Sequence, residues 1–169
     1  MARVALLLGG NEGDMKRTLQ TAQRLINERV GAVMRCSHRY QSEAWGFQSV
    51  HPFTNQALEI STDLSPIEVL DALQQIENEL GRNRAAEQIE KAATGARYTS
   101  RPIDIDIIFY GNEVIDEARL QIPHPLLAER LFALQPLVEI MRSFTHPVTG
   151  LSVGEMFEAH RKSETEPTE

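Results

Sequence analysis

The chain has 169 residues, of which 41% are hydrophobic and 24% are charged, as expected for one globular domain with a sizeable core. Its 24 acidic residues outnumber its 17 basic residues, and the net charge of −7 argues against a general nucleic-acid binder, whose surface would be basic. The single cysteine, Cys36, excludes an intrachain disulfide and a cysteine-based zinc site.

The N-terminal third of the chain alternates apolar strand and helix patterns. Residues 3–8 are apolar and end in Gly9-Gly10, which predicts a strand followed by a turn. Residues 13–29 carry apolar side chains at helical spacing and are followed by Gly31 as a stop signal. These apolar runs are too short to cross a bilayer and the N-terminus has no signal-peptide pattern; we therefore expect a cytoplasmic protein without a membrane partner.

Residues 32–40 alternate in polarity and predict a strand with one wet side. The predicted core face carries Ala32, Met34, Cys36 and Tyr40. Cys36 is expected to be a packed thiol on that face. A loop of about a dozen residues follows, long enough to suggest a functional role, and residues 53–63 read as the next strand.

The segment "LSPIEVLDALQQIENELGR" gives the clearest helix pattern in the chain. Ser65 is the expected N-cap, Pro66 lies in the first turn, and Glu68 completes a capping box. The predicted buried stripe consists of Val69, Leu73, Ile76 and Leu80. The helix is expected to end at Gly81, and residues 82–102 form a second long, charge-rich loop.

The stretch "RPIDIDIIFYGN", residues 101–112, combines a buried-strand composition with two aspartates, Asp104 and Asp106. Side chains two apart on a strand share a face, so the two carboxylates should lie about 6 to 7 Å apart on one side. The apolar residues Ile103, Ile105, Ile107 and Phe109 are expected on the other side. Mg²⁺ is the natural candidate to bridge such a pair, since it binds one or two carboxylates plus substrate phosphates; a solvent-facing pair is the alternative.

Arginines flank the acidic strand at positions 82, 84, 97 and 101. Arginines beside a metal-type carboxylate pair suggest a polyphosphate ligand, which needs both. Arginines in loops are also commonly just solvated. The P-loop motif is absent and "GGNEGD" does not have the spacing of a dinucleotide fingerprint.

The C-terminal third predicts a turn and short strand at "GNEVI", then helix over residues 126–140 with an interruption near Pro136, then a short helix in "TGLSVGEMFEAH". The element order is βαββαβ with C-terminal additions, which predicts an α+β, ferredoxin-like antiparallel sheet with packed helices. We expect a single domain over residues 1–160 and a disordered polar tail over residues 161–169.

Several ordered motifs resemble those of the 6-hydroxymethyl-7,8-dihydropterin pyrophosphokinases, over about residues 3–142. They are "LLLGGNEGD", "YQSEAWGF", "FTNQAL", "IENELGRNR", "SRPIDIDIIFYGN" and "IPHPLLAERLFALQPLVEI". The resemblance implies an enzyme of folate biosynthesis that transfers the terminal pyrophosphate of ATP to the hydroxymethyl group of the pterin and releases AMP. It also implies two Mg²⁺ ions, which stabilise charge and hold the attacking and leaving oxygens in line.

The resemblance carries roles onto individual positions. Asp104 and Asp106 match the metal-binding aspartates, with Arg82 and Arg101 at the transferring phosphates. The positions matched around ATP are Gln74, Glu77, Arg84, Tyr98, Ile107, Arg119, Gln121, His124 and Arg130. The positions matched around the pterin are Ser42, Glu43, Ala44, Trp45, Asn55 and Phe132. Asp106 is one hypothesis for the acceptor of the hydroxyl proton, and water is the other.

This sequence departs from the family pattern in four places. Gly9-Gly10-Asn11 replaces Gly-Ser-Asn, the loop before Arg97 is longer, Tyr98 stands where tryptophan is frequent, and Leu126 and Ala128 replace an arginine and a histidine. These changes bear on nucleotide affinity and loop closure more than on the reaction.

Two other functions remain open on the sequence alone. One is a nucleotide-binding module of the same fold without catalysis, and the other is an interaction domain that uses an exposed sheet face. Neither an obligate protein partner nor a nucleic-acid partner is indicated.

Overall fold

The computed structural model describes residues 1–42, 53–81 and 102–165. Within them, one five-stranded antiparallel sheet has the strand order β2-β4-β1-β5, and β3 also pairs with β4. Its strands are β1 (Ala2–Gly10), β2 (Ala32–Cys36), β3 (Tyr40–Ser42), β4 (Phe53–Thr62) and β5 (Asp104–Tyr110). A separate two-stranded sheet joins β6 (Ile115–Asp116) and β7 (Gln121–Ile122). The predicted βαββαβ order and ferredoxin-like architecture are confirmed.

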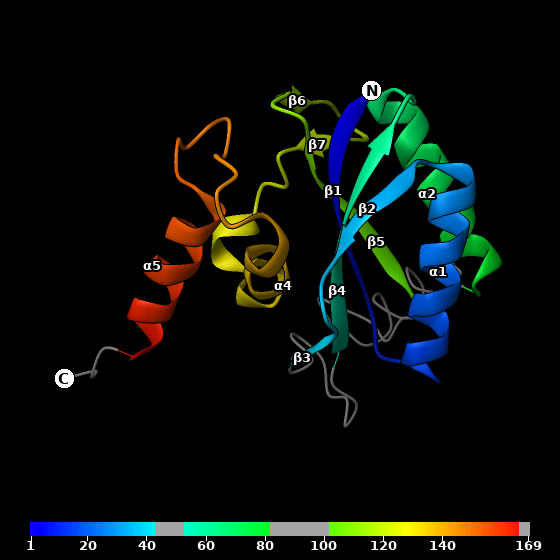
Figure 1. Cartoon of the computed structure of the whole chain (residues 1–169), viewed down its shortest axis with the longest axis horizontal. Coiled ribbons are helices and arrows are strands. Elements are labelled where there is room, and N and C mark those ends of the chain that lie inside the picture. The colour runs from blue at the N-terminus through cyan, green and yellow to red at the C-terminus, as the bar shows by residue number, and fades with distance from the viewer. Residues whose placement is uncertain (43–52, 82–101, 166–169) are drawn as a thin grey trace.

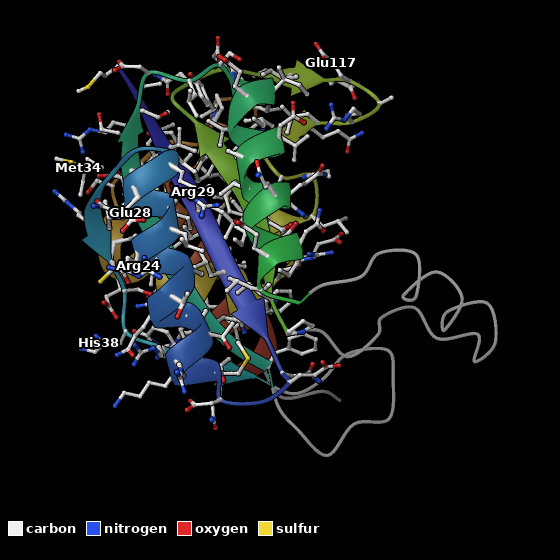
Figure 2. The ribbon with its side chains drawn as sticks, turned by 90° about the vertical axis from the view of Figure 1, so that its right-hand side faces the viewer. Arg24, Glu28, Arg29, Met34, His38 and Glu117 are labelled. Carbon is white, nitrogen blue, oxygen red and sulfur yellow. The ribbon has the colours of Figure 1, made fainter. Side chains whose placement is uncertain are left out.

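Helices cover both faces of the sheet (Figure 1). On one face lie α1 (Met15–Arg29) and α2 (Pro66–Glu79), which run side by side and are joined by an ion pair between Arg29 and Glu79 (Figure 2). On the other side lie α4 (Leu131–Met141) and α5 (Val153–Thr165), preceded by the short 3₁₀ helix η1 (Leu127–Glu129). None of the helices in these described ranges is long and apolar enough to span a membrane.

The sheet therefore separates two hydrophobic cores. The first core packs alternate side chains of β1 and β4, such as Leu6 and Leu58, against α1 and α2. The second core packs the intervening side chains, such as Leu7 and Ala57, against α4 and α5. Because both faces of the sheet are covered, β1 is buried from Val4 to Gly10.

The capping chemistry of α2 follows the sequence prediction. The Ser65 side chain accepts a hydrogen bond from the Glu68 backbone N–H, and the Glu68 carboxylate accepts one from the Ser65 backbone N–H. This reciprocal pair satisfies two helix N–H groups that have no partner inside the helix. The predicted stripe is buried at Val69, Leu73 and Ile76.

Three boundaries differ from the predictions. Gly9 and Gly10 belong to β1 rather than to a turn. Pro136 lies inside α4 and is buried, so the helical segment breaks at Arg130 instead. The last helix, α5, reaches Thr165 and so includes residues 161–165, which the composition had assigned to a disordered tail; residues 166–169 lie outside the described ranges.

The predicted core face of residues 32–40 is wrong, because two irregularities interrupt the alternation. Met34 is an extra residue between the pairs Val33–Ile60 and Arg35–Glu59, and it is 49% exposed. Cys36, at the open edge of the sheet, is exposed rather than packed. A second extra residue, between Cys36 and Tyr40, turns Tyr40 to the α4 side of the sheet.

Candidate active site along β5

The two aspartates of β5 share one face of the sheet, as their spacing predicts. In the pairing with β1, Asp106 lies opposite Leu7 and Asp104 lies opposite Gly9. Leu7 belongs to the second core, so both carboxylates lie on the side of the sheet that α4 covers. Both aspartates are half-buried, which brings two acidic groups into a region only partly open to water.

A bulge changes the second half of β5. Ala5 pairs with Phe109 whereas Leu6 pairs with Ile107, so Ile108 is an extra residue on β5. The bulge reverses the alternation and places Phe109 in the second core with Ile108, while Ile105 and Ile107 stay in the first core. The prediction that Phe109 lies on the face opposite the aspartates is therefore wrong.

Asn55 lies on the aspartate face, two strands away from Asp104. Gly9 pairs with Asn55 on one side and with Asp104 on the other. Two strand spacings separate the outer residues of this row by about 10 Å. A β-carbon placed on Gly9 would lie 2.5 Å from Asn55 Oδ1, so the amide group extends over the glycine, and only glycine leaves it that space.

Aromatic side chains accompany this row. Phe53 lies two residues before Asn55 on β4 and so projects to the same side, and Phe132 is the second residue of α4, packed at the border of the second core. The Arg130 guanidinium carbon lies 5.6 Å from the centre of the Phe132 ring. The sequence prediction did not include Phe53, although the period-two spacing from Asn55 could have identified it.

A cleft of about 370 Å³ runs beside the free edge of β5. Ile105, Asp106 and Ile107 line it from β5, and Leu70 lines it from α2. The rest of its wall comes from residues 118–125, including Arg119, Gln121 and His124. Four of the positions predicted around ATP thus lie on one cleft together with a predicted metal ligand.

Helix α2 provides two further predicted positions at this edge. The Glu77 side chain is 1% exposed, and its Oε2 accepts a hydrogen bond of 2.7 Å from the backbone N–H of Ile105. Since Ile105 lies between the two aspartates, this bond fixes the strand that carries them. One turn earlier, Gln74 Oε1 lies 3.5 Å from Arg119 Nη2, which also pairs with Asp71 Oδ1 at 2.5 Å.

His124 is a neutral imidazole at physiological pH. Its pKa is lowered to about 4, chiefly by burial and also by the positive charge of Arg130, against the opposing effect of the negative charge of Asp104. Its Nδ1 accepts a hydrogen bond of 3.3 Å from the Leu126 backbone N–H. A neutral ring that accepts at Nδ1 carries its proton on Nε2, so His124 can donate one hydrogen bond to a ligand without adding a charge.

The remaining predicted site residues lie outside the described ranges. They are Glu43, Ala44 and Trp45 of the pterin set, Arg84 and Tyr98 of the ATP set, and the phosphate arginines Arg82 and Arg101. Ser42 is the last residue of β3. Among the residues that the structure does describe, no three or more acidic, histidine or cysteine side chains are grouped as a metal site.

The chain matches one protein family over most of its length and is similar in sequence to several named relatives. Residues 5–142 match the family described as 7,8-dihydro-6-hydroxymethylpterin-pyrophosphokinase (HPPK). Two relatives are named 2-amino-4-hydroxy-6-hydroxymethyldihydropteridine pyrophosphokinase. The one from Porphyromonas gingivalis is 36% identical over 148 residues, which cover 87% of this chain and 95% of the relative. The one from Bacillus subtilis is 37% identical over 145 residues, which cover 85% of this chain and 81% of the relative.

Solved structures agree on the fold. A crystal structure of Plasmodium falciparum HPPK-DHPS with pteroate superposes with a TM-score of 0.76 at 14% identity, over 97% of this chain and 45% of that chain. This chain therefore spans less than half the length of that structure, and the likeness at this identity concerns the architecture.

Proposed function

Because the chain belongs to the 7,8-dihydro-6-hydroxymethylpterin-pyrophosphokinase family, we propose that the β5 cleft and the adjoining sheet face bind ATP and hydroxymethyldihydropterin side by side. The activity is the transfer of pyrophosphate to hydroxymethyldihydropterin in folate biosynthesis. One observation supports this assignment above all: Asn55, Gly9 and Asp104 lie in one row across three neighbouring strands. The row places an amide that can hydrogen-bond to a heterocycle two strands from a carboxylate that can bind a metal ion.

The residues present fit Mg²⁺ bound together with a nucleotide. Asp104 and Asp106 supply carboxylate oxygens from one strand face, and Mg²⁺ sites in nucleotide enzymes use one or two carboxylates with phosphate and water as the other ligands. Two carboxylates leave most of the octahedral positions around Mg²⁺ to phosphate and water oxygens, which suits a site that the triphosphate completes. When bound, Mg²⁺ supplies charge stabilisation and orientation for the phosphate oxygens.

The cleft gives the nucleotide both donors and an apolar surface. Arg119 and Gln121 lie at its rim, His124 offers a neutral donor, and Ile107 offers an apolar contact. Arg130 adds positive charge close to His124. Positive and neutral donors together suit a polyphosphate whose charge Mg²⁺ held by Asp104 and Asp106 would only partly neutralise.

The sheet face suits a flat ring with a mixed hydrogen-bonding edge. The Asn55 amide offers a donor and an acceptor and is only 4% exposed. Phe53 and Phe132 provide aromatic surface on β4 and α4 that can stack on such a ring. A pterin held here would present its hydroxymethyl group to phosphates anchored at Asp104.

The transfer requires little covalent chemistry from the protein. The hydroxymethyl oxygen attacks the β-phosphorus of ATP, the bond from that phosphorus to the α–β bridging oxygen breaks, and AMP leaves with the bonding electrons. The hydroxyl proton leaves to water or to a carboxylate. The protein's contribution is to hold the two substrates in line and to stabilise the developing charge.

An assay with ATP, Mg²⁺ and 6-hydroxymethyl-7,8-dihydropterin, with the nucleotide product identified by chromatography, tests the proposal. We expect AMP and pterin diphosphate in equal amounts. ADP as the product would indicate transfer of a single phosphoryl group and would contradict the proposal. ATP binding without turnover would favour a noncatalytic nucleotide-binding module, and no Mg²⁺-dependent ATP binding would favour an interaction domain.

A further inference from the structure

Glu139, in the last part of α4, accepts hydrogen bonds from His38, which lies between β2 and β3, and from Tyr40, the first residue of β3. The His38 backbone N–H lies 3.2 Å from Oε1 and 3.0 Å from Oε2, and the His38 ring Nδ1 lies 3.0 Å from Oε1. The Tyr40 hydroxyl donates to Oε1 at 2.5 Å. One carboxylate thus joins α4 to residues about a hundred positions earlier in the chain. Figure 2 shows that His38 lies at the sheet edge that also carries Met34.

The second strand irregularity makes this link possible. Four residue steps separate Cys36 from Tyr40, but only three separate their partners on β4, Leu58 and Asn55. The extra residue turns Tyr40 to the α4 side of the sheet, directly opposite Asn55. Ser37 anchors the irregularity: its Oγ accepts from the Ala57 backbone N–H at 2.9 Å, so the change of face is built into the sheet.

Both ends of the Glu139 link lead to the proposed pterin site. Tyr40 pairs with Asn55, and β3 ends at Ser42, which is itself one of the residues predicted to line the pterin pocket. On α4, Phe132 lies seven residues before Glu139, two helical turns away on the same side of the helix. The link therefore ties the wall that carries Phe132 to the wall that carries Asn55.

We propose that Glu139 is a positioning residue for the pterin substrate. It sets the separation of Phe132 and Asn55 without contacting the substrate. This inference rests on the proposed function above. The ionisation states support the geometry. The hydrogen bond to Glu139 is the largest cause that raises the pKa of Tyr40. For Glu139, burial acts to raise the pKa, but hydrogen bonds from Tyr40 and His38 outweigh it and lower the pKa.

Steady-state kinetics of Glu139→Ala tests the inference. We expect the KM for the pterin to rise about tenfold while the KM for ATP stays within about twofold. The substitution frees Phe132 to move relative to Asn55 at the pterin site, and it leaves the β5 cleft unchanged. Glu139→Gln keeps an acceptor oxygen for the Tyr40 hydroxyl and should recover most of the loss. Tyr40→Phe, which removes a single donor, should give a smaller rise in the pterin KM.

The ionisation of Tyr40, followed by absorbance, distinguishes loss of the Tyr40–Glu139 hydrogen bond from a general loss of stability. In wild-type protein the Tyr40 hydroxyl should ionise at a higher pH than in Glu139→Ala, which removes both the hydrogen bond and the charge; Tyr40 ionisation is measured as the tyrosinate absorbance that Tyr40→Phe removes. Unchanged Tyr40 ionisation and an unchanged pterin KM in the folded Glu139→Ala protein would overturn the inference.

Arg35→Ala is the matched control. Arg35 Nη1 donates to the Ile140 carbonyl at 2.9 Å, so it also ties α4 to the sheet, but through β2 rather than β3. We expect this variant to unfold at lower denaturant concentration with unchanged KM values. An equal rise in the pterin KM in Arg35→Ala and Glu139→Ala would show a merely structural role. Failure of the wild-type protein to form AMP would instead contradict the proposed function.

Discussion

At the scale of single residues, the acidic pair on β5 is the feature with the clearest chemical requirement. Asp104 and Asp106 project from one side of a strand that is otherwise apolar, and a cation bound between them would relieve their mutual repulsion. Loss of either carboxylate should therefore impair function far more than folding.

We expect Asp104→Asn and Asp106→Asn to reduce kcat/KM by about 10³-fold, because each removes charge that stabilises the transferring phosphates. Thermal unfolding should change little, since both side chains are only half-buried. Glu113→Gln, an exposed acid in the turn after the same strand, is the matched control and should retain full activity. Comparable losses in all three variants would contradict a specific role for the pair.

His124 gives a second prediction at this scale. In the folded protein its pKa is about 4, whereas an unfolded histidine titrates near 6.5. Between these values the unfolded chain binds more protons, so the free energy of unfolding should fall as the pH falls through this window.

Urea unfolding without Mg²⁺ measures this effect. Between pH 6.5 and 4.5, wild-type protein should lose roughly 2 kcal/mol more stability than His124→Gln. An NMR titration of the His124 ring that gave a midpoint near 6.5 would contradict the buried, neutral state.

At the scale of elements, the row across β4, β1 and β5 depends on the missing side chain of Gly9. In Gly9→Ala the new β-carbon would meet Asn55 Oδ1 at 2.5 Å, and the amide must move. We expect pterin binding, measured by fluorescence titration, to weaken at least about tenfold, which is the cost of losing a good hydrogen bond to a buried group. Binding of a non-hydrolysable ATP analogue should change little.

Gly150→Ala is the control for Gly9→Ala. Gly150 has φ of +75°, and a β-carbon added there would have no atom within 4 Å, so alanine at this position should cost about 1 kcal/mol of stability through backbone strain. Its pterin affinity should equal that of the wild type. Intact pterin binding in Gly9→Ala would show that Asn55 does not depend on this contact.

The sequence predicted elements well where one local rule governs them. The capping box at Ser65 and Glu68 fixed the start of α2, and the period-two spacing placed Asp104 and Asp106 on one face. The sequence-based prediction failed where an extra residue enters a strand. The bulges at Met34 and Ile108 and the irregularity after Cys36 depend on pairing with distant strands, and no local composition marks them.

The same reason explains what was missed at the site. Tyr40 was assigned to the wrong face because the alternation was followed through the irregularity. Glu139 was not recognised because its partners lie about a hundred residues away. Residues whose position depends on the pattern within one strand or one helix were predictable. Residues that connect two elements distant in sequence were not.

At the scale of the whole molecule, binding of the nucleotide should stabilise the fold only when metal and nucleotide are both present. Two carboxylates fill only part of the coordination sphere of Mg²⁺, which substrate phosphates usually help to complete, so Mg²⁺ alone should bind weakly. Mg²⁺ with a non-hydrolysable ATP analogue at a hundred times its Kd should add about 2.7 kcal/mol, which corresponds to about 5 to 10 °C in Tm for a chain of this size.

Differential scanning calorimetry provides that measurement. Mg²⁺ alone and the analogue with EDTA are the two controls, and each should shift the Tm much less than the combination. An equal shift with Mg²⁺ alone would indicate a preformed metal site and would contradict the shared one.

The position of β5 at the margin of the sheet has one more consequence. An unpaired strand margin invites another chain to add to it and so promotes self-association. Here the outward N–H of Ile105 is bonded to Glu77, and the outward carbonyl of Ile108 is bonded to the His124 backbone N–H. The Glu77 side chain and the segment that lines the β5 cleft thus also shield this strand from intermolecular pairing, so loss of the Glu77 carboxylate should cost solubility as well as turnover.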